Sequence, residues 1–146
     1  MILYADTSAL VKRYIREAHS GNVVKIIEQS EGVGSSVLTR VEMAATFAKA
    51  VRLGWVEDKN ALRAWRDYLE HWPSFTRLVV SSGMVERASE LAWEYGLRGY
   101  DSMHFASALI WQDALASPIT LATFDRDLWL AARKSGMDVW PLDLDK

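Results

Sequence analysis

The amino-acid sequence predicts an α/β fold in which helices cover both faces of a central parallel sheet. Short apolar segments alternate along the chain with longer segments that have the periodicity of amphipathic helices. This alternation is the order expected when each strand is followed by a helix. The chain has 146 residues, half of them hydrophobic, which is enough for one domain with a buried core. We therefore expect residues 1–146 to form a single domain.

The N-terminal third of the chain begins with a strand at residues 2–5. Thr7 or Ser8 is placed to cap the next helix, which we expect to run to about Glu17. A second helix is predicted within residues 20–32, where four apolar residues share one face. A short strand follows at residues 33–36.

Two helices then follow in succession. Thr39 opens the first, which stops at Gly54, because glycine is common just after a helix end. The second occupies residues 57–72 and ends before Pro73. Its apolar stripe is predicted to contain the residues Leu62, Trp65, Leu69 and Trp72.

The C-terminal half repeats the alternation of strand and helix. We expect a strand at residues 75–81, a helix that Ser81 or Ser82 caps and that ends at Gly96, and a long apolar helix over residues 100–116. A strand at residues 120–124, a helix from about Leu128 and a final strand at residues 138–142 complete the chain.

The net charge, the lack of cysteine and the short apolar runs argue against several classes of protein. The net charge of −2 argues against a protein that depends on bulk affinity for nucleic acid, although local basic patches remain possible. Without cysteine there are no disulfides or thiolate metal sites, so any metal must be held by oxygen or imidazole. No apolar run approaches the length of a membrane span, and Asp6 interrupts the first one. We therefore expect a cytoplasmic protein without a membrane segment.

Four acidic residues stand where strands give way to helices, or in the first turn of a helix. They are Asp6, Glu42, Asp101 and Asp125. Each has a simple alternative role as a helix cap, and Thr39 and Glu42 have the spacing of a capping box. Asp127 is an equally good cap for the last helix. His104 shares a helix face with Asp101, and a lone histidine on an apolar helix is more often a core residue than a ligand.

Taken together, the acids point to a metal site. A parallel sheet gathers its strand-to-helix junctions along one edge, where ligands bind. Two carboxylates at ~4 Å repel each other by about 4 kcal/mol at an effective dielectric constant of ~20, so a cluster stays ionised only around a cation. Oxygen ligands favour Mg²⁺ or Mn²⁺, and the chemistry that such an ion supports is metal-assisted hydrolysis. The sequence lacks a Gly-rich phosphate loop, a GxSxG elbow and an HExxH motif.

The segments around the four acids resemble the acidic motifs of PIN-domain ribonucleases, and of VapC-like toxins of type II toxin–antitoxin systems in particular. The segments are LYADTSALVK, SSVLTRVEMAATFAK, GYDSMHFASAL and LATFDRDLWLAARKSG. Each motif alone is weak, but all four occur in order and the resemblance runs from Ile2 to about Pro141.

The resemblance implies a PIN-like three-layer fold with a central parallel sheet in the order 3-2-1-4-5. It also implies that Asp6, Glu42, Asp101 and Asp125 bind Mg²⁺ or Mn²⁺ and form the catalytic site of an endoribonuclease. Ser8 and Thr123 match positions that support the acids by hydrogen bonding, and Asp127 matches a position that is only sometimes acidic. RNA as substrate, a homodimer and an antitoxin that covers the site are further implications.

Other roles remain open at this stage. The chain could be a catalytically weak PIN-like protein that binds RNA or a partner, or a stand-alone RNA-processing nuclease. A haloacid-type phosphatase requires a second aspartate two residues after its nucleophile, whereas Ser8 stands there. Six basic residues near the motifs are candidates for phosphate contacts: Lys12, Arg13, Arg16, Arg40, Arg98 and Arg126. Trp65 and Trp72 could form a groove for a partner helix, a dimer contact or plain core.

Overall fold

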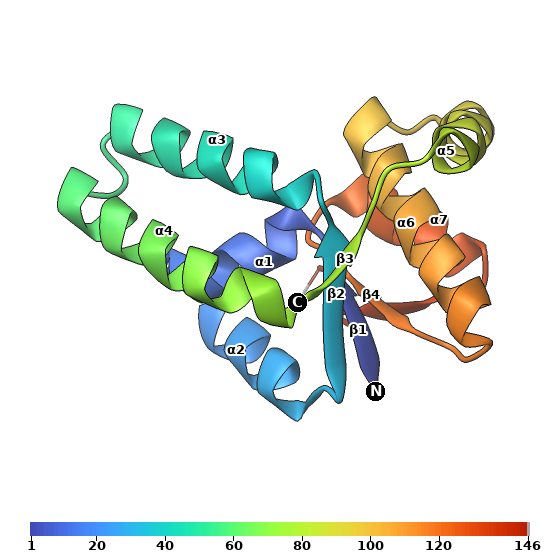
Figure 1. Cartoon of the computed structure of the whole chain (residues 1–146), viewed down its shortest axis with the longest axis horizontal. Coiled ribbons are helices and arrows are strands. Elements are labelled where there is room, and N and C mark those ends of the chain that lie inside the picture. The colour runs from blue at the N-terminus through green and yellow to red at the C-terminus, as the bar shows by residue number, and fades with distance from the viewer. Residues whose placement is uncertain (146) are drawn as a thin grey trace.

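The computed structural model describes residues 1–145 and contains a five-stranded parallel sheet in the order β3-β2-β1-β4-β5 (Figure 1). The predicted strand order is therefore confirmed. The strands are β1 (Ile2–Ala5), β2 (Gly32–Ser36), β3 (Thr76–Leu78), β4 (Thr120–Ala122) and β5 (Asp138–Trp140). The strand order reverses between β1 and β4, which are neighbours in space although most of the chain separates them in sequence.

Helices cover both faces of the sheet and give the molecule three layers. On one side lie α1 (Thr7–Tyr14), α2 (Ser20–Gln29), α3 (Thr39–Arg52) and α4 (Asp58–His71). On the other lie α5 (Ser82–Tyr95), α6 (Gly99–Leu115) and α7 (Arg126–Lys134), as Figure 1 shows. A short 3₁₀ helix, η1 (Trp72–Ser74), leads from α4 into β3. Within residues 1–145, no helix is both long and apolar enough to cross a membrane.

The side chains of β1 show why the sheet needs cover on both faces. Leu3 and Ala5 belong to the apolar cluster beneath α1 and α2, whereas Tyr4 belongs to the cluster beneath α6 and α7. Successive side chains of a strand point to opposite faces, so a central strand buried on both sides reads as a continuous apolar run. Asp6 ends this run.

The pairing of β1 with β4 determines what lies beside Asp6. Ala5 pairs with Ala122, and the Asp6 N–H donates to the Ala122 carbonyl at 3.1 Å. The residues that follow β4, Thr123 and Asp125, therefore lie next to Asp6 at the carboxyl edge of the sheet. This is the edge at which open parallel sheets bind their ligands.

Several predicted boundaries differ from the observed ones. The first helix ends at Tyr14 rather than near Glu17, and β4 stops at Ala122, so Thr123 and Phe124 belong to the loop. The third strand is shorter than predicted, with three residues, because the chain after Leu78 leaves the sheet at its edge.

Candidate active site

Asp6 is buried at the start of α1, where it caps the helix and holds two hydroxyl groups. Its side chain is 2 % exposed, and Oδ1 accepts from the Ala9 N–H at 3.0 Å. The Ser8 hydroxyl donates to Oδ1 at 2.7 Å, and the Thr123 hydroxyl donates to Oδ2 at 2.6 Å. The helix cap is thus Asp6 rather than Thr7 or Ser8, and capping and site formation coincide in one carboxylate.

Ser8 and Thr123 link Asp6 to the loop that carries Asp125. The two hydroxyls lie 3.3 Å apart, the Phe124 N–H donates to Ser8 Oγ at 2.8 Å, and the Asp125 N–H donates to Thr123 Oγ1 at 3.0 Å. Both residues therefore hold the Asp6 carboxylate by hydrogen bonds, and their part in a catalytic site stays a prediction.

Glu42 does not close a capping box, so that part of the sequence interpretation is wrong. The N-cap of α3 is Leu38, and the Thr39 hydroxyl lies 2.6 Å from the hydroxyl of Ser35. Glu42 Oε1 instead accepts from the Thr7 hydroxyl at 3.0 Å and lies 2.7 Å from His104 Nε2. Tertiary contacts, not the local backbone, determine where this carboxylate points.

His104 is the buried centre of a chain of hydrogen bonds. The sequence predicts it only as a core or rim residue. Its Nδ1 lies 2.8 Å from the Tyr4 hydroxyl and its Nε2 contacts Glu42, while the side chain is 3 % exposed. In the sequence, only the helical spacing of Asp101 and His104 indicates that His104 lies near the acids. The partner Glu42 lies 62 positions away and could not be inferred from it.

Burial and the neighbouring charges shift the ionisation of this buried half of the site. Burial raises the pKa of Asp6, although the charge of His104 and the hydrogen bonds from Thr123 and Ser8 oppose it. Burial lowers the pKa of His104, but the hydrogen bond to Glu42 and the charges of Asp6, Glu42 and Asp101 together outweigh it, so that the pKa is raised.

Asp101 and Asp125 form the more accessible half of the site, and Arg98 bridges them. The Arg98 Nε donates to Asp101 Oδ2 at 3.0 Å, and an Nη of the same guanidinium donates to Asp125 Oδ2 at 2.7 Å. Asp125 also caps α7 through a 2.9 Å bond from the Leu128 N–H. Burial, and then the charge of Asp125, raise the pKa of Asp101, whereas its contacts with Arg98 lower it.

Of the other predicted residues, Asp127 and most of the basic residues make no side-chain hydrogen bond or ion pair with these acids in the part of the chain that the structure describes, whereas Arg98 does. Asp127 is exposed in the first turn of α7, and its side chain makes no hydrogen bond or ion pair within residues 1–145. Arg126 pairs with Asp145, and Lys12 pairs with Glu17 at 3.1 Å. Of the six basic residues near the motifs, Arg98 is the one that pairs with the predicted acids within the described range.

The donor set fits a hard divalent cation, although the side chains are held by protein partners. Among the described residues, no three His, Asp or Glu side chains are arranged as a ready-made set of ligands. Arg98 occupies an oxygen of Asp101 and one of Asp125, and His104 occupies an oxygen of Glu42. The charge of Asp125 contributes to the raised pKa of Asp101, so a cation beside these two carboxylates is favourable, and carboxylate oxygens are the ligands that Mg²⁺ and Mn²⁺ prefer.

Comparisons with known proteins agree with this geometry. The PIN domain family matches residues 3–134. Over 145 residues the chain is 30 % identical to the ribonucleases VapC45 and VapC49 of Mycobacterium tuberculosis, covering 99 % of this chain and 98 % of each relative.

Solved structures share the fold. PAE2754 from Pyrobaculum aerophilum superposes with a TM-score of 0.65 at 25 % identity, covering 95 % of this chain and 83 % of the other. A toxin–antitoxin complex from Klebsiella pneumoniae contains a chain with a TM-score of 0.62 at 18 % identity, covering 87 % and 89 %. With its sheet order, its acidic edge and a family match across most of its length, this chain belongs to the PIN domain family.

Proposed function

We propose that this protein is a metal-dependent endoribonuclease that hydrolyses RNA phosphodiester bonds, and that it is the toxin of a toxin–antitoxin pair. The observation that carries the proposal is the cluster of Asp6, Glu42, Asp101 and Asp125 at the reversal point of a PIN sheet. Hydrogen bonds hold these acids in two sets: one joins Asp6, Asp125 and Asp101 through Thr123 and Arg98, and the other joins Glu42 to Thr7 and His104. The similarity to two VapC ribonucleases over nearly the whole chain supports the RNA substrate.

In this proposal the four acids hold Mg²⁺ or Mn²⁺. Such an ion supplies a Lewis acid that lowers the pKa of water and neutralises charge developing on the phosphoryl group. The protein contributes rigidity: Ser8 and Thr123 fix Asp6, while Thr7 and His104 fix Glu42. Ligands held by hydrogen bonds outside the metal shell keep their orientation when the ion and substrate arrive.

Arg98 has a separate part in the proposed site. The Arg98 side chain is 77 % exposed, and its guanidinium pairs with Asp101 and Asp125, the two more accessible acids. An ion that takes those carboxylates frees the guanidinium, whose planar fork suits the oxygens of a phosphodiester. We therefore assign Arg98 to binding RNA phosphate beside the acids.

The antitoxin, the homodimer and the cytoplasmic location stay proposals. The antitoxin is supported by the likeness of all four motifs to VapC-like toxins, and a chain of the same fold occurs in a toxin–antitoxin complex. Co-purification with the product of a neighbouring small gene tests the antitoxin, and the molar mass in solution tests the dimer.

Incubation of the purified protein with a mixed pool of small RNAs, in Mg²⁺, Mn²⁺ or EDTA, tests the ribonuclease function. The Asp101→Asn variant should lose metal-dependent cleavage. Asp113→Asn is the matched control, because Asp113 also lies on α6 and pairs with an arginine, Arg87, at 2.8 Å. Cleavage that survives in Asp101→Asn, or that EDTA does not stop, contradicts the proposal. Folded protein that binds RNA without cutting it supports the catalytically weak alternative.

A further inference from the structure

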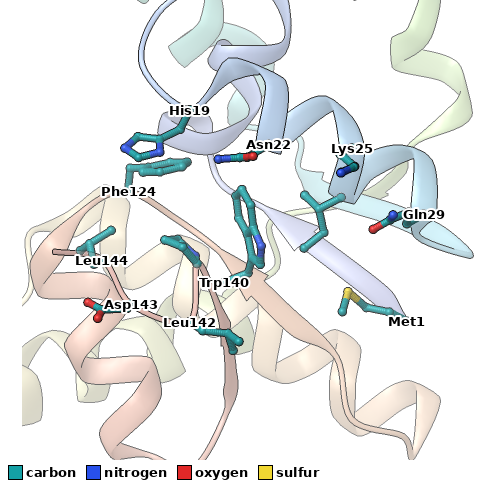
Figure 2. A pocket seen from close by; sticks show the side chains of 12 residues that line it. Met1, His19, Asn22, Lys25, Gln29, Phe124, Trp140, Leu142, Asp143 and Leu144 are labelled. Atoms are coloured by element: carbon teal, nitrogen blue, oxygen red, sulfur yellow. The ribbon is translucent and has the colours of Figure 1, made fainter. Parts of the chain in front are cut away.

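A cavity of about 550 Å³ lies between α2 and the segment that follows β5, next to the acidic edge. Figure 2 shows α2 residues along one side, the C-terminal residues Leu142 and Leu144 along the other, and Trp140 standing between them. The volume falls within the ~300–1,000 Å³ of sites that hold small organic groups. None of the four acids lines it, so the cavity is separate from the proposed metal site.

Aromatic rings form one part of the cavity wall, away from Met1 (Figure 2). His19 stacks on Phe124, with ring centroids 5.4 Å apart and an interplanar angle of 26° (Figure 2). Trp140 meets Phe124 edge-on at 5.7 Å. Phe124 and Trp140 are half-buried against the core cluster of this face, while His19 is exposed. The chain thus presents flat rings at the wall of an open cavity.

Cationic and amide groups accompany the rings. Lys12 Nζ lies 4.6 Å from the centre of the Phe124 ring, but it is paired with Glu17 and Lys12 does not line the cavity, so Lys25 is the lysine of the cavity wall. Asn22, Lys25 and Gln29 are exposed on α2 and line the cavity. Side-chain amides have both donors and acceptors for the edge of a base, and a lysine ammonium attracts phosphate.

Backbone and hydrogen bonds connect one wall of the cavity to the acidic site. Phe124 directly precedes Asp125, and its N–H donates at 2.8 Å to Ser8 Oγ, which in turn donates to Asp6. Consecutive Cα atoms lie about 3.8 Å apart, so the backbone that carries the ring adjoins the backbone that carries the carboxylate, although the ring packs against the α1 and α2 cluster and the carboxylate against Arg98. A chain whose phosphate lies at the acids has its adjoining nucleotide within reach of the cavity.

We propose that this cavity is a subsite for one unpaired nucleobase of the RNA substrate, beside the phosphate at the acidic site. The proposal rests on the proposed ribonuclease function and concerns where one nucleotide of the substrate binds. Bases of unpaired RNA are accessible for stacking on aromatic side chains and for hydrogen bonding along their edges, whereas paired bases are not.

The test measures binding of a short fluorescent single-stranded RNA of mixed sequence, in EDTA so that metal-dependent cleavage does not interfere. His19→Asn removes the ring and keeps a residue that tolerates the positive φ of 69° at this position. Lys25→Gln removes a charge at the cavity, and Lys59→Gln, an exposed lysine on α4, is its matched control.

We expect His19→Asn to weaken Kd roughly 5- to 100-fold, the range for loss of one stacked base, and Lys25→Gln to weaken it while Lys59→Gln does not. In a series of RNAs with one abasic position each, one position should weaken binding to the unaltered protein, and His19→Asn should abolish that dependence. Equal Kd values for all variants overturn the subsite and leave the cavity as a packing defect or a protein-docking surface.

The cleavage assay separates failure of the subsite from failure of the proposed function. Metal-dependent cleavage together with unchanged Kd values overturns the subsite and leaves the nuclease standing. Base-dependent binding without cleavage in either metal supports the subsite and removes the nuclease function. Absence of RNA binding by the unaltered protein overturns the subsite, whatever the cleavage result.

Discussion

At the residue scale, Arg98 holds the place of a cation between two anions, and we predict that it competes with metal. Removing its charge with Arg98→Gln should tighten Mn²⁺ binding roughly 2- to 10-fold, because the ion no longer displaces two exposed ion pairs. Titration calorimetry gives the Kd directly, and Arg87→Gln breaks an ion pair elsewhere as a control. An unchanged or weaker Mn²⁺ affinity in Arg98→Gln contradicts the prediction.

His104 carries a second prediction at this scale. His104→Phe keeps an aromatic ring but removes the hydrogen bonds to Tyr4 and Glu42, so the free energy of unfolding should fall by about 1–3 kcal/mol and cleavage should fall with it. Urea unfolding gives the stability.

Tyr4→Phe is the control for His104→Phe, because it removes the bond at Nδ1 and leaves Glu42 held. It should keep cleavage while losing some stability. If both variants lose stability and neither loses cleavage, His104 is structural and does not position Glu42.

The contrast between Asp6 and Glu42 shows what the sequence can predict at this scale. The sequence predicts that Asp6 and Asp125 lie beyond the ends of apolar strands, a pattern that is local in the chain; Asp6 directly follows β1, and Asp125 follows β4 after two loop residues. Glu42 matched a capping box by spacing, yet its partners are Thr7 and His104. Spacing within a short segment does not reveal such long-range contacts. The assignment of these acids to metal binding stays a prediction.

At the scale of secondary-structure elements, β2 and α6 meet at a position where only glycine fits. A Cβ on Gly34 would lie 2.6 Å from Cζ3 of Trp111 and 3.1 Å from the backbone oxygen of Thr76. Gly34→Ala should therefore lower the free energy of unfolding by about 1–3 kcal/mol through overpacking.

Gly32→Ala in the same strand is the control for Gly34→Ala, because its Cβ would meet Cδ1 of Ile2 at 3.4 Å, an ordinary contact. Chemical denaturation of both variants measures the difference. If the two substitutions have equal effects, intrinsic strand propensity rather than the Trp111 contact determines them.

Helix α4 shows that a predicted apolar stripe can miss part of the buried face. Of the predicted residues, Trp72 is buried and Trp65 and Leu69 pack against the core cluster, whereas Leu62 is 48 % exposed. The buried face also includes the residues Ala61, Ala64 and Tyr68. The pattern of leucine and tryptophan located the helix and most of its buried side, but it did not include these three residues.

At the scale of the whole molecule, the strand order and the three layers agree with the expectation from the family resemblance. Alternation of strands and helices was enough for a parallel sheet with both faces covered. It did not determine which strands are neighbours, because the same alternation is compatible with more than one order. The order 3-2-1-4-5 brings Asp6 beside the loop of Asp125, so the composition of the site depends on the topology.

Clustered acids should make the stability of the whole protein depend on divalent ions. An ion that binds only the folded state adds about 2.7 kcal/mol when its concentration is a hundred times Kd. We expect Mn²⁺ to raise the Tm by several degrees, EDTA to reverse the shift, and Asp101→Asn to reduce it. A rise of equal size in Asp101→Asn would mean that the ion binds elsewhere.

The charge of Asp101 should make the metal-free protein less stable at neutral pH than a variant that lacks this charge. Burial and the charge of Asp125 raise the pKa of Asp101 above its ordinary value, so the folded state binds that proton more tightly than the unfolded chain does. Ionisation of Asp101 therefore lowers the free energy of unfolding at pH values above its raised pKa. This loss disappears as the pH falls through the raised pKa toward the pKa of Asp101 in the unfolded chain. In EDTA, Asp101→Asn should have a higher Tm than the unaltered protein at pH 7, with a difference that shrinks in acid. A difference independent of pH, or of opposite sign, would show that Arg98 already compensates the charge of Asp101 in the folded protein.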